Sequence, residues 1–170
     1  MSETLENVSG QQLVITRVVK APRDLVFQAW TEVERFAKWW GPKGFDLGVA
    51  NADIRPGGEF HYSMKSAAGQ EMWGKFVYRE IEAPERLVFV SSFSNPEGEI
   101  TQAPFSNDWP REVLNVVTFT EQDGETTMTL RGGPINASAA EQAFFEGMFD
   151  SMRGGFGGTF DQLDAYLASM

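Results

Sequence analysis

The feature that most constrains the fold is an apolar stripe near the C-terminal end. Large apolar residues recur there at intervals of four, three, four, four, three and four positions: Phe145, Phe149, Met152, Phe156, Phe160, Leu163 and Leu167. This spacing follows one face of a helix. Ser138 and Glu141 have the spacing of a capping box, so we predict that one helix of about 30 residues, roughly 45 Å long, begins there.

Four glycines fall inside this stripe, at Gly154, Gly155, Gly157 and Gly158. Each costs a helix about 1 kcal/mol relative to alanine. Burial of each large apolar residue contributes about 1.5 to 3 kcal/mol, so the helix is expected to persist. A phosphate-binding P-loop would need Lys and Ser or Thr after the glycines, and a dinucleotide-binding motif would need a strand before them. Here the helical stripe passes through the glycines without interruption, which argues against both. We expect the glycines to permit close packing or a bend, with a ligand contact as the alternative.

The middle of the chain has a period of two, which predicts antiparallel strands. A first strand is expected at 13–19, followed by strands at 45–54, 59–65, 72–81, 87–93, 112–120 and 126–131. One face of the strand at 59–65 is expected to be buried and the other wet, because Phe60, Tyr62 and Met64 alternate with Glu59, His61, Ser63 and Lys65.

Two short helices are expected between the first two strands. Pro22 suits the start of the first, and the capping-box spacing of Thr31 and Glu34 predicts the start of the second, which Gly41 and Pro42 end. The connection 94–110 is long for a link between strands and is expected to be a lid or a packed crossover.

Five segments together resemble the domain called activator of heat-shock-protein-90 ATPase homologue (AHSA-type), of the START-related, pollen-allergen-like superfamily (SRPBCC). They are APRDLVFQAWTEVERFAKWWGPKGF (21–45), DIRPGGEF (53–60), APERLVFV (83–90), VTFTEQDGETTMTL (117–130) and GGTFDQLDAYL (157–167). The resemblance implies an α+β helix-grip fold: a curved antiparallel sheet, two short helices after the first strand, and a long C-terminal helix across the sheet. A hydrophobic cavity is implied between sheet and helix. The domain would cover 12–170, after a flexible segment 1–11.

Composition restricts the functional classes. The net charge of -10 argues against nucleic acid and anionic membranes as partners. No cysteine is present, and His61 is the one histidine, expected at the surface, so neither a metal nor another cofactor is expected. The polar N-terminal segment has no secretion signal, and no run of the chain is long enough to span a membrane, so we expect a cytoplasmic protein.

Aromatic and methionine side chains supply the candidate ligand site, with ordinary core packing as the alternative. Asn115 is included because a polar residue on a buried face either satisfies a backbone group or points at a ligand. The candidates are Trp30, Trp40, Phe60, Tyr62, Met64, Trp73, Asn115, Val117, Phe145, Met148, Phe149 and Met152.

The function expected from these residues and from the resemblance is binding of a hydrophobic or aromatic small molecule. Superfamily relatives bind lipids, sterols, plant hormones or antibiotics, and some cyclise polyketides. A polyketide cyclase-like enzyme is therefore the first alternative, and it would need polar groups that converge in the cavity. A chaperone-directed interaction module is the second and would need an exposed apolar patch. No catalytic residue is identified, and a homodimer stays open.

Overall fold

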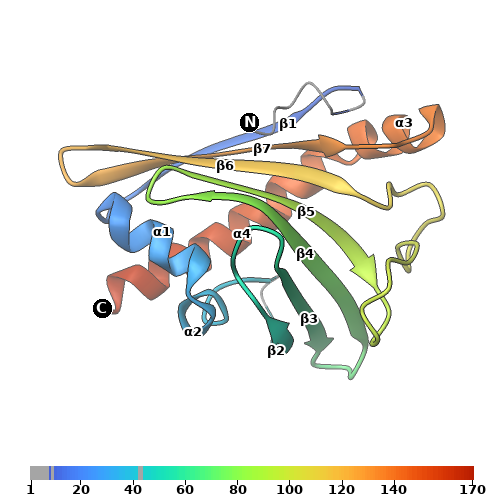
Figure 1. Cartoon of the computed structure of the whole chain (residues 1–170), viewed down its shortest axis with the longest axis horizontal. Coiled ribbons are helices and arrows are strands. Elements are labelled where there is room, and N and C mark those ends of the chain that lie inside the picture. Colours follow the sequence, from blue (N-terminus) through green and yellow to red (C-terminus); the bar gives the residue numbers. More distant parts are fainter. Residues whose placement is uncertain (1–7, 9, 42–43) are drawn as a thin grey trace.

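The structure is a computed structural model that describes residues 8, 10–41 and 44–170. Its elements follow the expected order along the chain (Figure 1): β1 (Leu13–Val19), α1 (Arg23–Thr31), α2 (Val33–Phe36), β2 (Phe45–Ala52), β3 (Glu59–Ser66), β4 (Glu71–Glu82), β5 (Arg86–Ser94), β6 (Val113–Gln122), β7 (Glu125–Pro134), α3 (Ala139–Gly147) and α4 (Phe149–Ala168). The predicted α+β helix-grip fold is confirmed.

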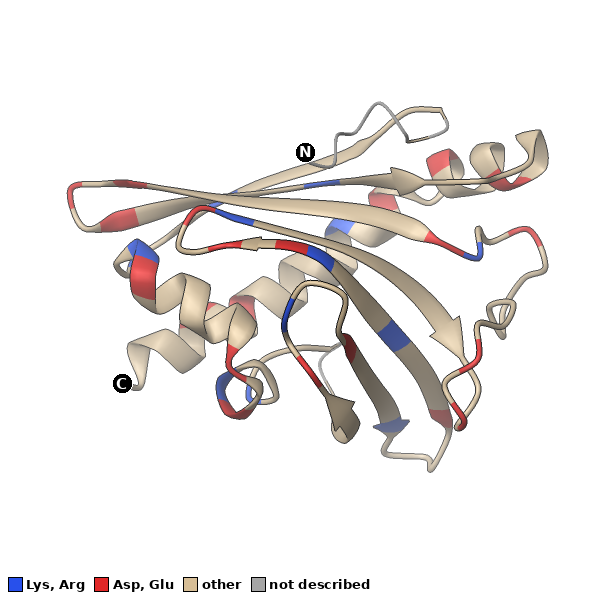
Figure 2. Ribbon diagram, viewed as in Figure 1, with Lys and Arg blue, Asp and Glu red and all other residues tan. Residues whose placement is uncertain are grey.

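One curved antiparallel sheet of seven strands, in the order β1-β7-β6-β5-β4-β3-β2, forms the frame of the molecule. The first strand pairs with the last, and the other neighbours are consecutive in the chain. The helix α4 runs along the concave side of the sheet, while α1 and α2 close one end (Figure 1). Acidic side chains lie at the β6–β7 turn and along α3 and α4 (Figure 2).

Most of the core lies on the concave side of the sheet, where the rings of α1, α2, β3, β4 and α4 meet. Trp30, Phe36, Trp39, Phe60 and Phe160 are each at most 1% exposed. A second, smaller cluster lies apart from this core and consists of Val88, Val90, Leu114, Val116 and Ile135, with Val8 packed against it. Residues 1–7 and 9 of the segment predicted to be flexible lie outside the described residues.

The single C-terminal helix that we predicted is in fact two helices. The capping box at its start is confirmed, with Ser138 N donating to Glu141 Oε1 at 2.8 Å and Glu141 N donating to Ser138 Oγ at 3.1 Å. The helix breaks at Met148, whose φ is -99° and ψ 4°. Gly147, a weak helix former, precedes the break. The stripe continues across it, because the rings of Phe145 and Phe149 lie 5.7 Å apart.

The capping box predicted at Thr31 is wrong, and so is close packing, one of the two roles expected for the glycines of α4. Thr31 does not cap α2: it ends α1, and its Oγ1 donates to Phe27 O at 2.9 Å. Glu32 is the N-cap of α2 and makes no side-chain cap bond. The glycines of α4 do not serve close packing, because a Cβ added at any of Gly154, Gly155, Gly157 and Gly158 would have no heavy atom within 4 Å.

His61 is also not the surface residue that we predicted, because its side chain is only 7% exposed. Its Nε2 lies 3.2 Å from Asn95 O, and its ring lies 5.1 Å from that of Trp73. Asn95 belongs to the connection after β5, so this connection covers a face of β3 that the alternation alone assigns to solvent.

Candidate functional site

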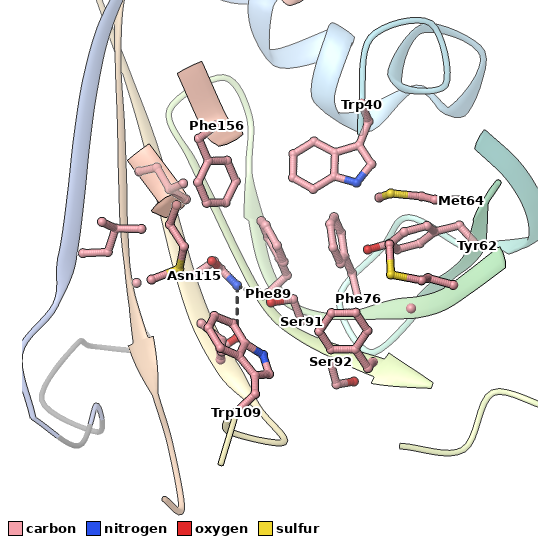
Figure 3. A pocket seen from close by; sticks show the side chains of 18 of the residues that line it. Trp40, Tyr62, Met64, Phe76, Phe89, Ser91, Ser92, Trp109, Asn115 and Phe156 are labelled. Atoms are coloured by element: carbon pink, nitrogen blue, oxygen red, sulfur yellow. Dashed lines mark hydrogen bonds between the residues drawn. The ribbon is translucent and has the colours of Figure 1, made fainter. Parts of the chain in front are cut away.

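A cavity of about 190 Å³ lies between the concave face of the sheet, α4 and the connection between β5 and β6 (Figure 3). Cross-strand pairing explains why these side chains share one face. Tyr62 is paired with Gly74, Phe76 with Ser91, and Phe89 with Asn115. Residues directly opposite in an antiparallel pair point to the same side of the sheet. The floor of the cavity is therefore built from β3, β4, β5 and β6.

The structure brings eight of the twelve candidate residues into the cavity lining: Trp30, Trp40, Tyr62, Met64, Trp73, Asn115, Phe145 and Met152. Four others are placed elsewhere. Phe60 and Val117 are fully buried in the core. Met148 lies at the junction of α3 and α4, and Phe149 packs its ring against Phe145, with the Arg153 guanidinium 5.6 Å from the ring centre.

Several lining residues were not among the candidates: Leu13, Met72, Phe76, Phe89, Ser91, Ser92, Phe93, Trp109, Val113, Leu130 and Phe156, together with Gly74 and Gly132. Phe89 and Ser91 are two positions apart in β5, so they point to the same face of the sheet. Once either residue had been assigned to the inner face, the other could have been predicted there too. Trp109 could not have been found in this way, because it comes from the irregular connection after β5. Its ring lies 5.3 Å from that of Phe145.

Two glycines, Gly74 and Gly132, leave the space that the polar side chains of Tyr62 and Asn115 occupy in the lining. A Cβ at Gly74 would lie 2.9 Å from Tyr62 Oη, and one at Gly132 would lie 3.1 Å from Asn115 Oδ1. Both distances are shorter than an ordinary carbon to oxygen contact. Gly74 of β4 is paired with Tyr62, and Gly132 of β7 is paired with Asn115. A larger residue at either position would collide with the side chain opposite.

Asn115 uses its amide hydrogens within the protein. Its Nδ2 donates to Ser91 Oγ and to Val113 O, both at 3.0 Å (Figure 3). The side chain thus satisfies a backbone carbonyl and also lies in the cavity wall. Of the two roles considered for this residue, the backbone one is present in the structure, and the ligand role stays a prediction.

The tyrosines near the site are kept neutral. Burial raises the pKa of Tyr62 to about 12. The interaction of the phenol with the Trp40 indole N–H, which lacks the geometry of an ordinary hydrogen bond, lowers this pKa. Burial also raises the pKa of Tyr78, as does the nearby Tyr62, but Tyr78 is outside the lining. Tyr62 is therefore a protonated phenol at neutral pH.

The described lining contains no Asp, Glu, His, Lys or Arg. Across residues 8, 10–41 and 44–170, no group of three or more acidic or histidine side chains is arranged to hold a metal ion. No helix in the described part of the chain has the length and apolar character of a membrane span. The chemistry available at the cavity is thus apolar contact and neutral hydrogen bonding.

A sheet that curves around a C-terminal helix, with a cavity between the two, defines a helix-grip domain. The sequence model of the family described as Activator of Hsp90 ATPase homolog 1-like protein matches residues 20–168. The chain therefore belongs to this family, as the five sequence motifs predicted. No curated protein gives a significant match to the sequence.

Solved structures agree with this assignment. A protein from Mycobacterium smegmatis is 28% identical, with a TM-score of 0.76, and the match covers 98% of this chain and 94% of that one. A protein from Arthrobacter aurescens is 22% identical, with a TM-score of 0.78 and coverage of 99% and 91%. An AHSA1 protein from Silicibacter pomeroyi is 16% identical, with a TM-score of 0.71 and coverage of 93% and 98%. The last two likenesses concern the fold alone.

Proposed function

We propose that the protein binds an uncharged hydrophobic or aromatic small molecule in the cavity between the sheet and α4. The observation that carries this proposal is the lining itself, which combines aromatic rings and methionines with a few neutral polar groups. Small-molecule sites typically have this composition, and methionine side chains adapt to the shape of a guest.

The size of the cavity restricts the guest. An apolar cavity of about 150 Å³ accommodates benzene. The cavity of about 190 Å³ therefore suits a guest of about one to two rings before the methionines move. The stacked rings of Phe76 and Phe89, 4.4 Å apart, offer a flat surface to such a guest.

The groups that face the cavity favour binding of a guest over catalysis of a reaction on it. Proton transfer near neutral pH needs a group whose pKa lies near the working pH. The described lining offers the Tyr62 phenol, with a pKa raised to about 12, and no carboxylate, imidazole or amine. This chemistry supports a binding protein rather than the cyclase-like alternative.

The large apolar residues that are exposed in the described chain do not favour the interaction module. They are spread over β1, β2, the β5–β6 connection and the C-terminal end: Val14, Val18, Val49, Phe105 and Met170. A docking face would need these side chains to form one contiguous patch.

Native mass spectrometry of the protein purified from its host, with identification of whatever is bound, tests the proposal first. Titration with naphthalene, followed by tryptophan fluorescence, tests it in vitro. Met152→Trp places an indole in the cavity and should abolish naphthalene binding, whereas Ser151→Trp adds the same indole at an exposed position next to it and should not. Absence of any bound guest and of naphthalene binding would refute the proposal.

A further inference from the structure

We propose that the indole N–H of Trp40 is the specificity-determining hydrogen-bond donor of the cavity. The preferred guest is then an uncharged aromatic molecule that carries an acceptor oxygen, such as a carbonyl, at one end. This inference rests on the proposed function, because it states which guests the cavity selects.

The Trp40 nitrogen differs from the other buried indole nitrogens of the chain. Trp30 Nε1 donates to Met128 Sδ at 3.2 Å, and Trp39 Nε1 donates to Ala29 O at 3.0 Å. Trp40 Nε1 is buried and makes no hydrogen bond of ordinary geometry with any described residue, although it interacts with the neighbouring Tyr62 phenol. A buried donor without a partner is costly, and native proteins seldom leave one unpaired.

The backbone around Trp40 is held in place by α4. Gln162 Nε2 donates to Trp39 O at 3.0 Å and to Gly41 O at 2.7 Å. Thr159 Oγ1, on the same helix, donates to Gly41 O at 3.1 Å. The two carbonyls that flank Trp40 are therefore fixed, and the helix that forms one wall of the cavity also sets the position of the indole.

Ring packing fixes the indole itself. The ring of Phe36 stacks on it at 5.1 Å, and the edge of the Phe76 ring meets it at 5.4 Å. With both contacts in place, the side chain cannot rotate to another partner without losing them. The donor is thus preorganised, which lowers the cost of binding an acceptor at that point.

The nitrogen edge of the indole faces Met64 and Tyr62, on the far side of the cavity from Asn115 (Figure 3). Met64 is the flexible part of this arrangement: its Sδ would lie 3.6 Å from a Cβ at Gly41, next to Trp40. Because methionine changes rotamer readily, a guest can displace Met64 and place its oxygen at the indole N–H. On the other side, both amide hydrogens of Asn115 are already used.

Two matched probes test the inference. Acetophenone and α-methylstyrene share one ring and nearly one shape, but only the first has a carbonyl oxygen. For each protein variant, the measured quantity is the ratio of their dissociation constants from calorimetry. We expect Trp40→Phe to reduce the preference for acetophenone by about five- to tenfold relative to the unmodified protein, the effect of one buried hydrogen bond. Comparison of ratios cancels the different hydration of the two probes.

Trp109→Phe is the matched control, because it also replaces a lining indole by a phenyl ring. Its ratio should equal that of the unmodified protein. Tyr62→Phe tests the neighbouring hydroxyl and should leave most of the preference in place. An unchanged ratio in Trp40→Phe, or loss of the preference in Tyr62→Phe alone, would overturn the inference and leave the proposed function standing.

A second measurement does not depend on the folding of the variants. In the unmodified protein, the NMR signal of the Trp40 indole proton should move downfield when acetophenone binds and stay nearly unchanged with α-methylstyrene. Equal shifts would overturn the inference, as would binding of naphthalene without binding of acetophenone. Failure of naphthalene and both probes to bind would instead refute the proposed function.

Discussion

Arg17 of β1 donates two hydrogen bonds to the Asp164 carboxylate of α4, from Nε at 3.2 Å and from Nη2 at 2.7 Å. The same guanidinium pairs with Asp161 and donates to Gly157 O at 3.3 Å. Burial acts to lower the pKa of Arg17, but the hydrogen bonds and charges of Asp161 and Asp164 raise it overall. The first strand is thus tied to the last helix, and these two elements bound the cavity on one side.

Replacement of Arg17 by methionine should lower the free energy of unfolding by about 1 kcal/mol, since the pair is partly exposed and solvent screens it. Urea unfolding measures this change. Arg153→Met is the control, because Arg153 lies on α4, the helix that carries Asp164, and its Nη1 is 3.6 Å from the fully exposed Asp150. Equal effects of the two substitutions would show that the two hydrogen bonds from Arg17 to Asp164 Oδ2 contribute nothing.

Alanine at Gly154 or Gly155 should stabilise the protein by about 0.5 to 1 kcal/mol each, because alanine is the better helix former and the added methyl group enters open space. Thermal unfolding of each single variant measures the gain. Gly58→Ala is the opposite control, since its Cβ would lie 2.0 Å from Asp53 O and must destabilise. A loss of stability at both helical positions would mean that α4 needs these glycines for a contact that forms only with a partner.

The sequence predicted the elements well where periodicity determined them. The first strand was predicted at its observed limits, Leu13–Val19, and the capping box at Ser138 was correct. The helix break at Met148 was missed because the apolar stripe passes through it without a change of period. Local backbone geometry, rather than the position of apolar residues, separates α3 from α4.

The candidate site could be predicted only in part, since its lining depends on which strands are paired. The alternation of residues along the strands correctly predicted that Tyr62, Met64 and Asn115 lie on the inner face of the sheet. It could not reveal that the connection after β5 covers His61 and brings Trp109 to the cavity, because both are contacts between distant segments. Irregular connections carry no periodic signal from which such contacts could be predicted.

Stability should fall at alkaline pH because of Tyr62. Its pKa is about 12 in the folded protein and about 10 when exposed, so above pH 10 the unfolded chain loses this proton first. The unfolded state is then favoured, and stability declines by about 2 kcal/mol as the pH rises through this interval. Urea unfolding from pH 8 to 11.5 measures the decline.

Tyr62→Phe should reduce the loss of folding stability above pH 10. The loss that remains should come from Tyr78, whose pKa burial also raises. The dissociation constant for naphthalene should stay constant between pH 6 and 9, because Tyr62 remains protonated and the described lining holds no charged group. A stability curve that is flat to pH 11.5 would contradict the burial of the phenol.

Gly74→Ala should weaken guest binding through Tyr62. The new Cβ would lie 2.9 Å from Tyr62 Oη and 3.3 Å from Ser92 O, so the phenol must move, and the space open to it is the cavity. We expect at least a tenfold loss of naphthalene affinity. The double variant Gly74→Ala, Tyr62→Leu should recover much of this loss, because the shorter side chain no longer meets the added methyl group. If the double variant binds no better than the single one, the backbone carbonyl of Ser92 rather than the phenol limits this position, and Gly74 serves the pairing of β4 with β5.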